Sequence, residues 1–205
     1  MTRDPVVIGH RDSMRPSDLP GMEPAPRETH SLFFALWPDD ATRARIAAAA
    51  DALHAGDATR GRRIKPHRYH LTLHFLGERA SFPHDLAAHA GAAAAGVHAA
   101  TFDLPLDSVG SFDGVGKPCW LGCSTTPDAL RSLYDQLGDA LRRAGCRGAG
   151  GPRFVPHVTL LRDAERCTQA RSPVRIDWHV DEFVLIHSRT QPPAPYRRLG
   201  EWPLD

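Results

Sequence analysis

Two short segments with the pattern histidine, apolar residue, threonine, apolar residue constrain the fold of this chain more than any other feature. They are residues 70–73 (HLTL) and 157–160 (HVTL), far apart in the sequence. Both lie in runs that are typical of β-strands. Residues two apart on a strand share a face, so each histidine should lie beside its threonine, with the apolar residues on the opposite face.

The elements expected around these segments do not alternate strictly between strand and helix. Helices are predicted at 39–54, 84–97 and 126–144, the last with Thr126 as N-cap and Gly145 as its end. Strands are predicted at 31–37, 70–76 (ended by Gly77), 101–109, 119–123, 153–161, 182–188 and 196–204. Each half contains a strand, a helix and a motif strand, as in a weak internal duplication. This order favours an α+β fold with mostly antiparallel sheets, helices on the outer faces and the motif strands facing each other across a cleft.

Composition places the chain among soluble globular proteins. Residues 1–30 are rich in proline and lack apolar periodicity, so a flexible tail is expected before a domain over 31–205. No apolar stretch is long enough to span a membrane, and the N-terminus has no signal-peptide core, which predicts a cytoplasmic protein. The four cysteines have no CxxC spacing and are expected to be reduced.

Charge is balanced over the whole chain but not locally. The formal charge is only +1, so no overall field attracts nucleic acid or membrane, and any affinity for phosphate must be local. The densest basic cluster precedes the first motif and contains no acid: Arg60, Arg62, Arg63, Lys65 and Arg68. Two interpretations stay open for it, a solvated surface and a rim that attracts phosphate.

Two imidazoles and two hydroxyls that converge on one point suit in-line phosphoryl chemistry without a metal. A neutral histidine takes a proton from water while a protonated histidine gives one to the leaving oxygen. Both protonation states are accessible near pH 7. Thr72 and Thr159 can donate hydrogen bonds to the non-bridging phosphate oxygens. A single histidine on a strand is usually structural, so the hypothesis depends on the pairing of His70 with His157.

The two motifs in their context resemble a known family. Residues 70–77 (HLTLHFLG) and 156–162 (PHVTLLR) are similar to the paired HxTx signatures of the 2H phosphoesterases, and among these to the RNA 2′,3′-cyclic phosphodiesterases, also described as 2′-5′ RNA ligases. The resemblance continues through residues 32–36, 65–66 and 183–188 to Tyr196, covering roughly residues 31–205. It implies a bilobal, pseudo-two-fold domain with a central cleft.

The resemblance also implies an activity and roles for residues. Members open a terminal 2′,3′-cyclic phosphate to a 2′-phosphate, so the expected partners are RNA ends or cyclic nucleotides, with no cofactor and no membrane, and the protein is expected to be a monomer. By analogy His70 is the general acid and His157 the general base. Phe75 and Arg162, each five residues after a motif histidine, are candidates for stacking on the terminal base; a core aromatic and a surface cation are the alternatives.

Two other functions fit parts of the pattern. A metal-dependent hydrolase would use His70 and His74, expected on one strand face, with Asp or Cys from elsewhere. It leaves the threonines unexplained, so no metal is expected. A non-catalytic module that binds RNA ends would need the basic loop and the threonine hydroxyls but not both imidazoles.

Overall fold

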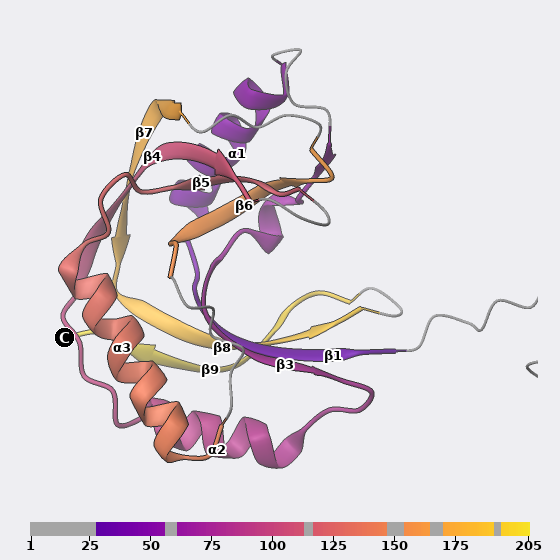
Figure 1. Ribbon diagram of the computed structural model, residues 1–205, viewed down its shortest axis with the longest axis vertical. Coiled ribbons are helices and arrows are strands. Elements are labelled where there is room, and N and C mark those ends of the chain that lie inside the picture. Colours follow the sequence, from indigo (N-terminus) through magenta and orange to yellow (C-terminus); the bar gives the residue numbers. More distant parts are fainter. Residues whose placement is uncertain (1–27, 56–60, 113–116, 147–153, 165–169, 191–193) are drawn as a thin grey trace, which may run out of the picture.

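Both motif segments lie in the middle of one curled antiparallel sheet (Figure 1). The computed structural model describes residues 28–55, 61–112, 117–146, 154–164, 170–190 and 194–205. Its strands are β1 (His30–Leu36), β2 (Arg62–Arg63), β3 (Leu71–Arg79), β4 (Phe102–Ser111), β5 (Cys119–Gly122), β6 (His157–Arg162), β7 (Ala170–Val180), β8 (Glu182–Arg189) and β9 (Arg197–Pro203). They pair in the order β7-β4-β5-β6-β3-β1-β8-β9, with β2 added to β6.

The α-helices of the described ranges cover the outside of the curl (Figure 1). They are α1 (Asp40–Ala55), α2 (His84–Ala94) and α3 (Asp128–Arg143), and the 3₁₀ turn η2 (Pro66–Arg68) precedes β3. Helix α1 packs against β7 and η2, α3 packs against β3, and α2 packs against α3 and β9. The predicted α+β fold, with antiparallel strands, outer helices and a central cleft, is confirmed.

The two halves of the sheet meet at a single residue pair. Strands β3 and β6 are antiparallel, and Leu71 lies opposite Val158. These are the middle residues of the two His-x-Thr tripeptides, so the sheet is nearly symmetric about this pair. Strands β3-β1-β8-β9 lie on one side and β6-β5-β4-β7 on the other. Because β1-α1-β3 and β5-α3-β6 repeat one order, the duplication expected from the sequence is present in the fold.

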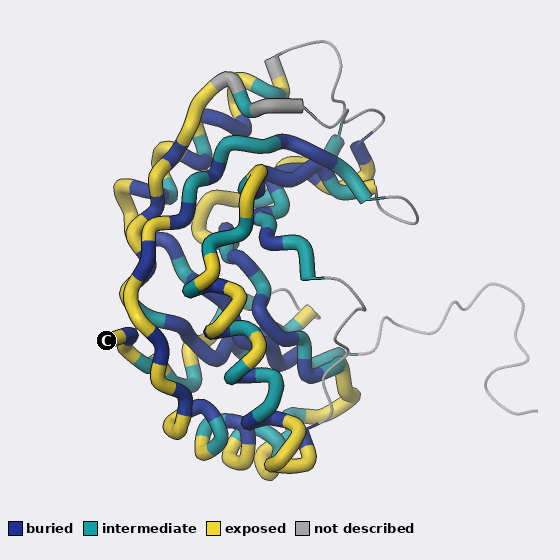
Figure 2. Tube along the Cα trace, turned by 60° about the vertical axis from the view of Figure 1, so that its left-hand side comes forward, coloured by how far each residue is buried: buried dark blue, intermediate teal, exposed yellow. Residues whose placement is uncertain are grey.

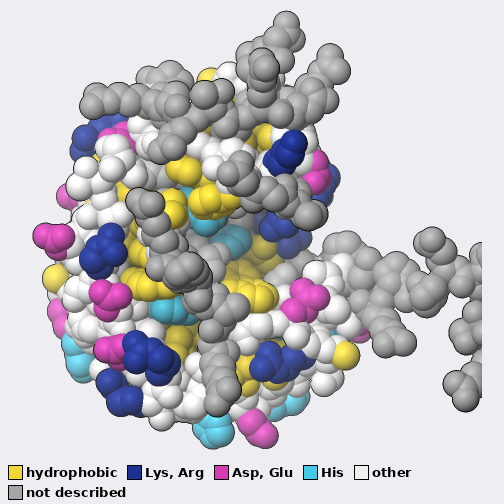
Figure 3. All heavy atoms as spheres, viewed as in Figure 1, with side chains coloured by type: hydrophobic (Ala, Val, Ile, Leu, Met, Phe, Trp, Pro, Cys, Tyr) yellow, Lys and Arg dark blue, Asp and Glu magenta, His cyan; other side chains and the backbone are white. Residues whose placement is uncertain are grey.

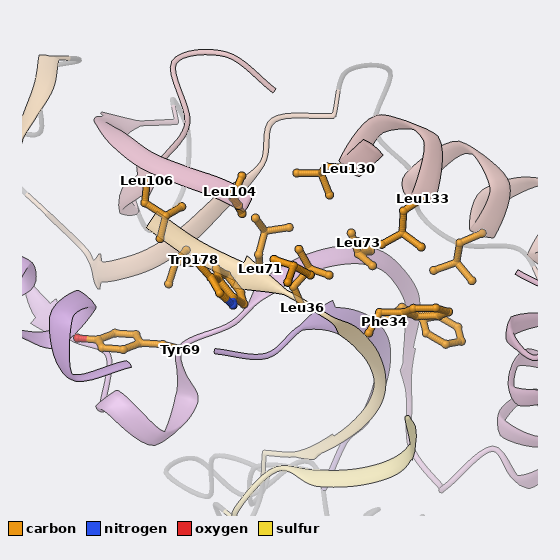
Figure 4. Packing of buried hydrophobic residues seen from close by; sticks show 14 of the residues in the cluster. Phe34, Leu36, Tyr69, Leu71, Leu73, Leu104, Leu106, Leu130, Leu133 and Trp178 are labelled. Carbon is orange, nitrogen blue, oxygen red and sulfur yellow. The ribbon is translucent and has the colours of Figure 1, made fainter. Parts of the chain in front are cut away.

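The main core lies between the sheet and the helices that cover it. Buried residues are concentrated in the strands, whereas the helices alternate between buried and exposed positions (Figure 2). Leu130 and Leu133 point from α3 toward Leu73 on β3 (Figure 4). Burying a side chain of this size stabilises the fold by about 1.5–3 kcal/mol. The motif strand is therefore held from its outer face, which leaves its inner face available for polar groups.

Helix boundaries agree with the prediction at three of the four predicted ends of α1 and α3. The Asp39 side chain accepts a hydrogen bond from the Thr42 N–H (2.6 Å) at the start of α1. Gly145 ends α3 with a φ of +71°, a conformation that favours glycine. The predicted N-cap Thr126 is wrong, because α3 begins at Asp128 and Pro127 holds the cap position without a side-chain hydrogen bond.

Two strand predictions need correction. Strand β3 does not stop at Gly77 but continues to Arg79, because glycine adopts a φ of +103° within the strand. Strand β7 was not predicted. Its sequence contains Pro173, which has no N–H to donate, but β7 lies at the edge of the sheet, where proline is tolerated.

Three further expectations concern the tail, the membrane and the cysteines. Residues 1–27 of the expected tail lie outside the described residues, and His30 already belongs to β1. No helix in the described ranges is long and apolar enough to cross a membrane. Cys123 and Cys146 are free thiols, but Cys119 is disulfide-bonded, so the expectation that all four cysteines are reduced is wrong; Cys167 is outside the described part.

His74 holds α3 against β3. Its Nε2–H donates to the Tyr134 carbonyl (2.8 Å), and its ring stacks on the Tyr134 ring with the centroids 4.2 Å apart. A Cβ placed on Gly138, one turn further along α3, would lie 2.9 Å from the His74 ring. Glycine is therefore required where the helix passes the imidazole.

We expect Gly138→Ala to destabilise the protein by about 1–3 kcal/mol, because the added methyl overlaps a fixed ring. Gly91→Ala in α2 is the matched control. Among the described residues its new Cβ would meet only the Trp202 ring, at 3.9 Å, so the better helix propensity of alanine should stabilise by about 0.5–1 kcal/mol. Urea unfolding measures both changes. Equal stabilisation by the two substitutions would contradict the assigned position of His74.

Candidate active site

The four polar motif side chains share the concave face of the sheet. Extending the antiparallel register by one residue on each side of the central pair sets His70 opposite Thr159 and Thr72 opposite His157. The central leucine and valine are fully buried, so these flanking residues point the other way. All four line one cavity of about 620 Å³. Figure 3 shows the hollow between the lobes, with histidine and hydrophobic side chains gathered in it.

The two histidines are held in the same way. His70 Nδ1 lies 2.7 Å from the Arg68 carbonyl oxygen, and His157 Nδ1 lies 2.7 Å from the Val155 carbonyl oxygen. A carbonyl can only accept, so Nδ1 carries the hydrogen in each ring. Nε2 is then the nitrogen that can exchange a proton with a ligand. Each ring is thus oriented by the backbone two residues before it.

Aromatic side chains surround both imidazoles. The His70 ring contacts Phe33 and Tyr196, with centroids 4.9 and 5.5 Å apart, and stacks on Trp37 at 6.2 Å. His157 contacts Phe112 at 4.8 Å and Trp120 at 6.1 Å. These rings exclude water from the imidazoles without supplying a charged partner.

This environment lowers the pKa of both histidines. Burial is the main cause of the fall in the pKa of His70 to about 4, and the nearby charges of His157, Arg68 and Arg162 add to it. Burial also lowers the pKa of His157 below its usual 6.5. Both rings are therefore neutral at pH 7 without a ligand. A bound anion would favour the imidazolium form and raise the pKa again.

A β-bulge follows the threonine in each motif strand. In β3, Thr72 is opposite Ala35 but the next pair is His74 with Phe34, so one residue is extra. In β6, Thr159 is opposite Trp120 and the next pair skips Leu160 in the same way. An extra residue reverses the alternation of faces beyond it. The fifth residue after each histidine is thereby turned to the concave face.

The bulges decide where Phe75 and Arg162 lie. Arg162 lines the 620 Å³ cavity. Phe75 is opposite Phe33 in the sheet and packs in the same small cluster as Trp37 and Tyr196, next to the cavity rather than among the residues that line it. The two motifs therefore differ at this fifth position, where β3 carries an aromatic ring and β6 carries a cation.

The expectation that His70 and His74 share a strand face is wrong. The bulge in β3 turns His74 to the outer face, where it lines a separate cavity of about 270 Å³ with Tyr134 and Cys146. The pair on which the metal-dependent alternative rested is therefore not formed. Within the described ranges, no three or more His, Cys, Asp or Glu side chains are grouped so that they could hold a metal ion.

The basic cluster before the first motif faces the site. The cavity is lined by cations from this cluster and from β6 and, among the described residues, by no carboxylate: Arg62, Arg63, Lys65, Arg68 and Arg162. Of the two interpretations left open by the sequence, a rim around the cavity agrees with these positions. Arg60 lies outside the described residues.

Several residues of the site were not identified from the sequence. Trp37, Phe112 and Trp120 contact the histidines, and Thr190 lines the cavity. None lies in a motif, and each reaches the site from a neighbouring strand or loop. Strand pairing would have been the only signal, since Trp120 lies directly opposite Thr159.

A curled antiparallel sheet that brings two HxTx strands to one cleft defines a 2H phosphoesterase fold. The model of the 2′-5′ RNA ligase superfamily matches residues 37–192. The chain therefore belongs to this superfamily, as the resemblance of the motifs predicted.

Individual relatives agree with this assignment. The chain is 34% identical over 148 residues to an RNA 2′,3′-cyclic phosphodiesterase of Escherichia coli, covering 70% of this chain and 80% of the relative. It is 30% identical over 175 residues to one of Thermus thermophilus, covering 80% and 84%. Among solved structures, E. coli LigT in apo form superposes with a TM-score of 0.73 at 29% identity, covering 86% of this chain and 98% of LigT. LigT has also been crystallised with 3′-AMP, in a structure with a TM-score of 0.71 and the same identity and coverage.

We expect the titration of the imidazoles to reveal this arrangement. In NMR spectra of the free protein, His70 should titrate near pH 4 and His157 below pH 6.5, both as the Nδ1–H tautomer when neutral. Inorganic phosphate should raise both pKa values, because an anion stabilises the imidazolium. His74 is an internal control, with the opposite tautomer and no response to phosphate. A His70 pKa of 6.5 or higher without ligand would show that this imidazole is not buried among the aromatic rings.

Proposed function

We propose that this protein hydrolyses the terminal 2′,3′-cyclic phosphate of RNA to a 2′-phosphate with two histidines and no metal ion. The observation that carries the proposal is the pair of Nδ1-anchored imidazoles, each opposite the other motif's threonine, in one cavity lined by cations. The relatives in E. coli and T. thermophilus, named RNA 2′,3′-cyclic phosphodiesterases, support the choice of substrate.

The chemistry follows from the two Nε2 atoms. His157, as the base, accepts a proton from water through Nε2, and the water oxygen attacks phosphorus. The bond from phosphorus to O3′ breaks, and His70, as the acid, gives its Nε2 proton to O3′. The products are a 2′-phosphomonoester and a free 3′-hydroxyl. His157 ends the reaction with one proton more and His70 with one proton fewer, and exchange with solvent restores both rings. The assignment of acid and base follows the family resemblance, because the motifs themselves are nearly symmetric.

The low pKa values of the free site suit this scheme once the substrate is bound. A cyclic phosphodiester carries a negative charge, which favours protonation of one imidazole. The charge that grows on the non-bridging oxygens is stabilised by hydrogen bonds from Thr72 and Thr159. The cationic rim adds long-range attraction for the RNA end. Phe75 and Arg162 complete the proposed substrate-binding residues, as an aromatic surface for the terminal base and a cation that contacts the RNA end.

His70→Ala and His157→Ala should each lower hydrolysis of a short RNA with a 2′,3′-cyclic end by orders of magnitude, while binding of the 2′-phosphate product falls far less. Chromatography of the wild-type product should show the phosphate on the 2′ oxygen. His84→Ala, in the first turn of α2 on the outer face, is a control and should keep full activity. Unchanged hydrolysis in either motif variant would exclude the two-histidine mechanism. Loss of activity with EDTA would show a metal requirement, and binding without turnover in the wild type would favour a non-catalytic module.

The pH dependence of kcat/KM should be bell-shaped with both limbs below pH 6.5. The rate rises as the base loses its proton and falls as the acid loses its own, and both pKa values of the free enzyme are lowered by burial. The profile of kcat should lie at higher pH, because the bound phosphate raises the same pKa values. Initial rates from pH 4 to 8 test this. A flat kcat/KM profile between pH 5 and 8 would contradict it.

A further inference from the structure

Two arginines, one on β2 and one on the motif strand β6, lie directly opposite each other. Strand β2 pairs with β6 so that Arg62 is the cross-strand partner of Arg162, and both line the cavity. Like charges in this position destabilise a strand pair. A short strand that places two arginines opposite each other at one cavity is best explained by an anion that both bind.

Neither arginine is neutralised within the described part of the chain. Arg62 has only a carboxylate contact of 3.7 Å with Asp163, and both side chains are more than half exposed, so the contact contributes little. Arg162 has no carboxylate within ion-pair distance in the same ranges. Two neighbouring cations do have partners: Arg63 pairs with Asp51, and Arg68 lies over the Tyr196 ring at 4.3 Å.

Arg162 lies further along β6 than Thr159, although its charge still reaches the His70 ring. Arg162 is three positions beyond Thr159 along β6, on the order of 10 Å of strand. The cyclic phosphate already has two imidazoles and two hydroxyls at the centre of the cleft. The arginine pair is therefore available for a second phosphate further along the same chain, and two guanidinium groups can hold it with several charged hydrogen bonds.

We propose that Arg62 and Arg162 form a subsite for the phosphodiester on the 5′ side of the terminal nucleotide. The preferred substrate is then an RNA end of at least two nucleotides rather than a cyclic mononucleotide. This inference rests on the proposed function and adds the substrate class to it. It also explains the two-residue strand β2, whose pairing with β6 places Arg62 at the cleft.

The test compares a dinucleotide with a 2′,3′-cyclic end to the matching cyclic mononucleotide. Wild-type kcat/KM should be higher for the dinucleotide by roughly tenfold or more, the effect of a charged hydrogen-bonded contact. Arg62→Gln and Arg162→Gln should each reduce this ratio toward one, and the double variant should lose less than the sum of both in free energy, because the arginines share one phosphate. Arg131→Gln, an exposed arginine of α3, is the control and should leave the ratio unchanged.

Binding of the 2′-phosphorylated dinucleotide gives a second measurement. The slope of log Kd against log salt should fall by about 0.7 when the subsite is removed, as for one phosphate contact in a single strand. Equal wild-type kcat/KM for the two substrates, or a ratio and salt slope unaffected by both substitutions, would overturn the subsite while leaving the hydrolase in place. Failure of the wild type to hydrolyse either substrate would instead overturn the proposed function.

Discussion

The contact between β3 and β6 is the constraint on which the site depends. Only Leu71 and Val158 pair there, and both are fully buried. Because the pair lies at the middle of both His-x-Thr tripeptides, burying it turns two histidines and two threonines together to the opposite face. A shift of one residue in this register would move the polar groups into the core. The hydrophobic core and the polar site are thus specified by the same pair of apolar residues.

The site combines two opposing effects. Aromatic rings around His70 and His157 lower the pKa of both, which leaves the free site with two neutral bases. The cations around the cavity lower the pKa of His70 further and at the same time attract an anion. An anionic ligand between the rings relieves both effects, because it compensates the arginines and stabilises an imidazolium. In the proposed reaction, protonation of the site is therefore linked to the arrival of the phosphate.

The outcome of particular predictions shows where local sequence information ends. The faces of His70 and Thr72 follow from alternation, and so did strand β3, although it begins at Leu71, directly after His70. His74 was placed wrongly because a bulge is not a local property: it depends on how many residues of β1 oppose those of β3. Strand β7 was missed because its pairing with β4 compensates for a weak local pattern. Thr126 had a good capping side chain, yet Pro127, with its fixed φ, holds the cap position of α3.

The sequence alone determined the periodic features of this protein: which segments pair polar with apolar residues, the apolar stripe of α3, and two motifs whose side chains suit phosphate chemistry. These features depend on spacings of two to four residues, which are present in the sequence itself. Only the tertiary structure decided that the motifs meet, that both bulges turn a fifth residue into the cleft, and that Arg62 lies opposite Arg162. Such contacts join residues distant in the chain, and their energies exist only after the core has closed around them.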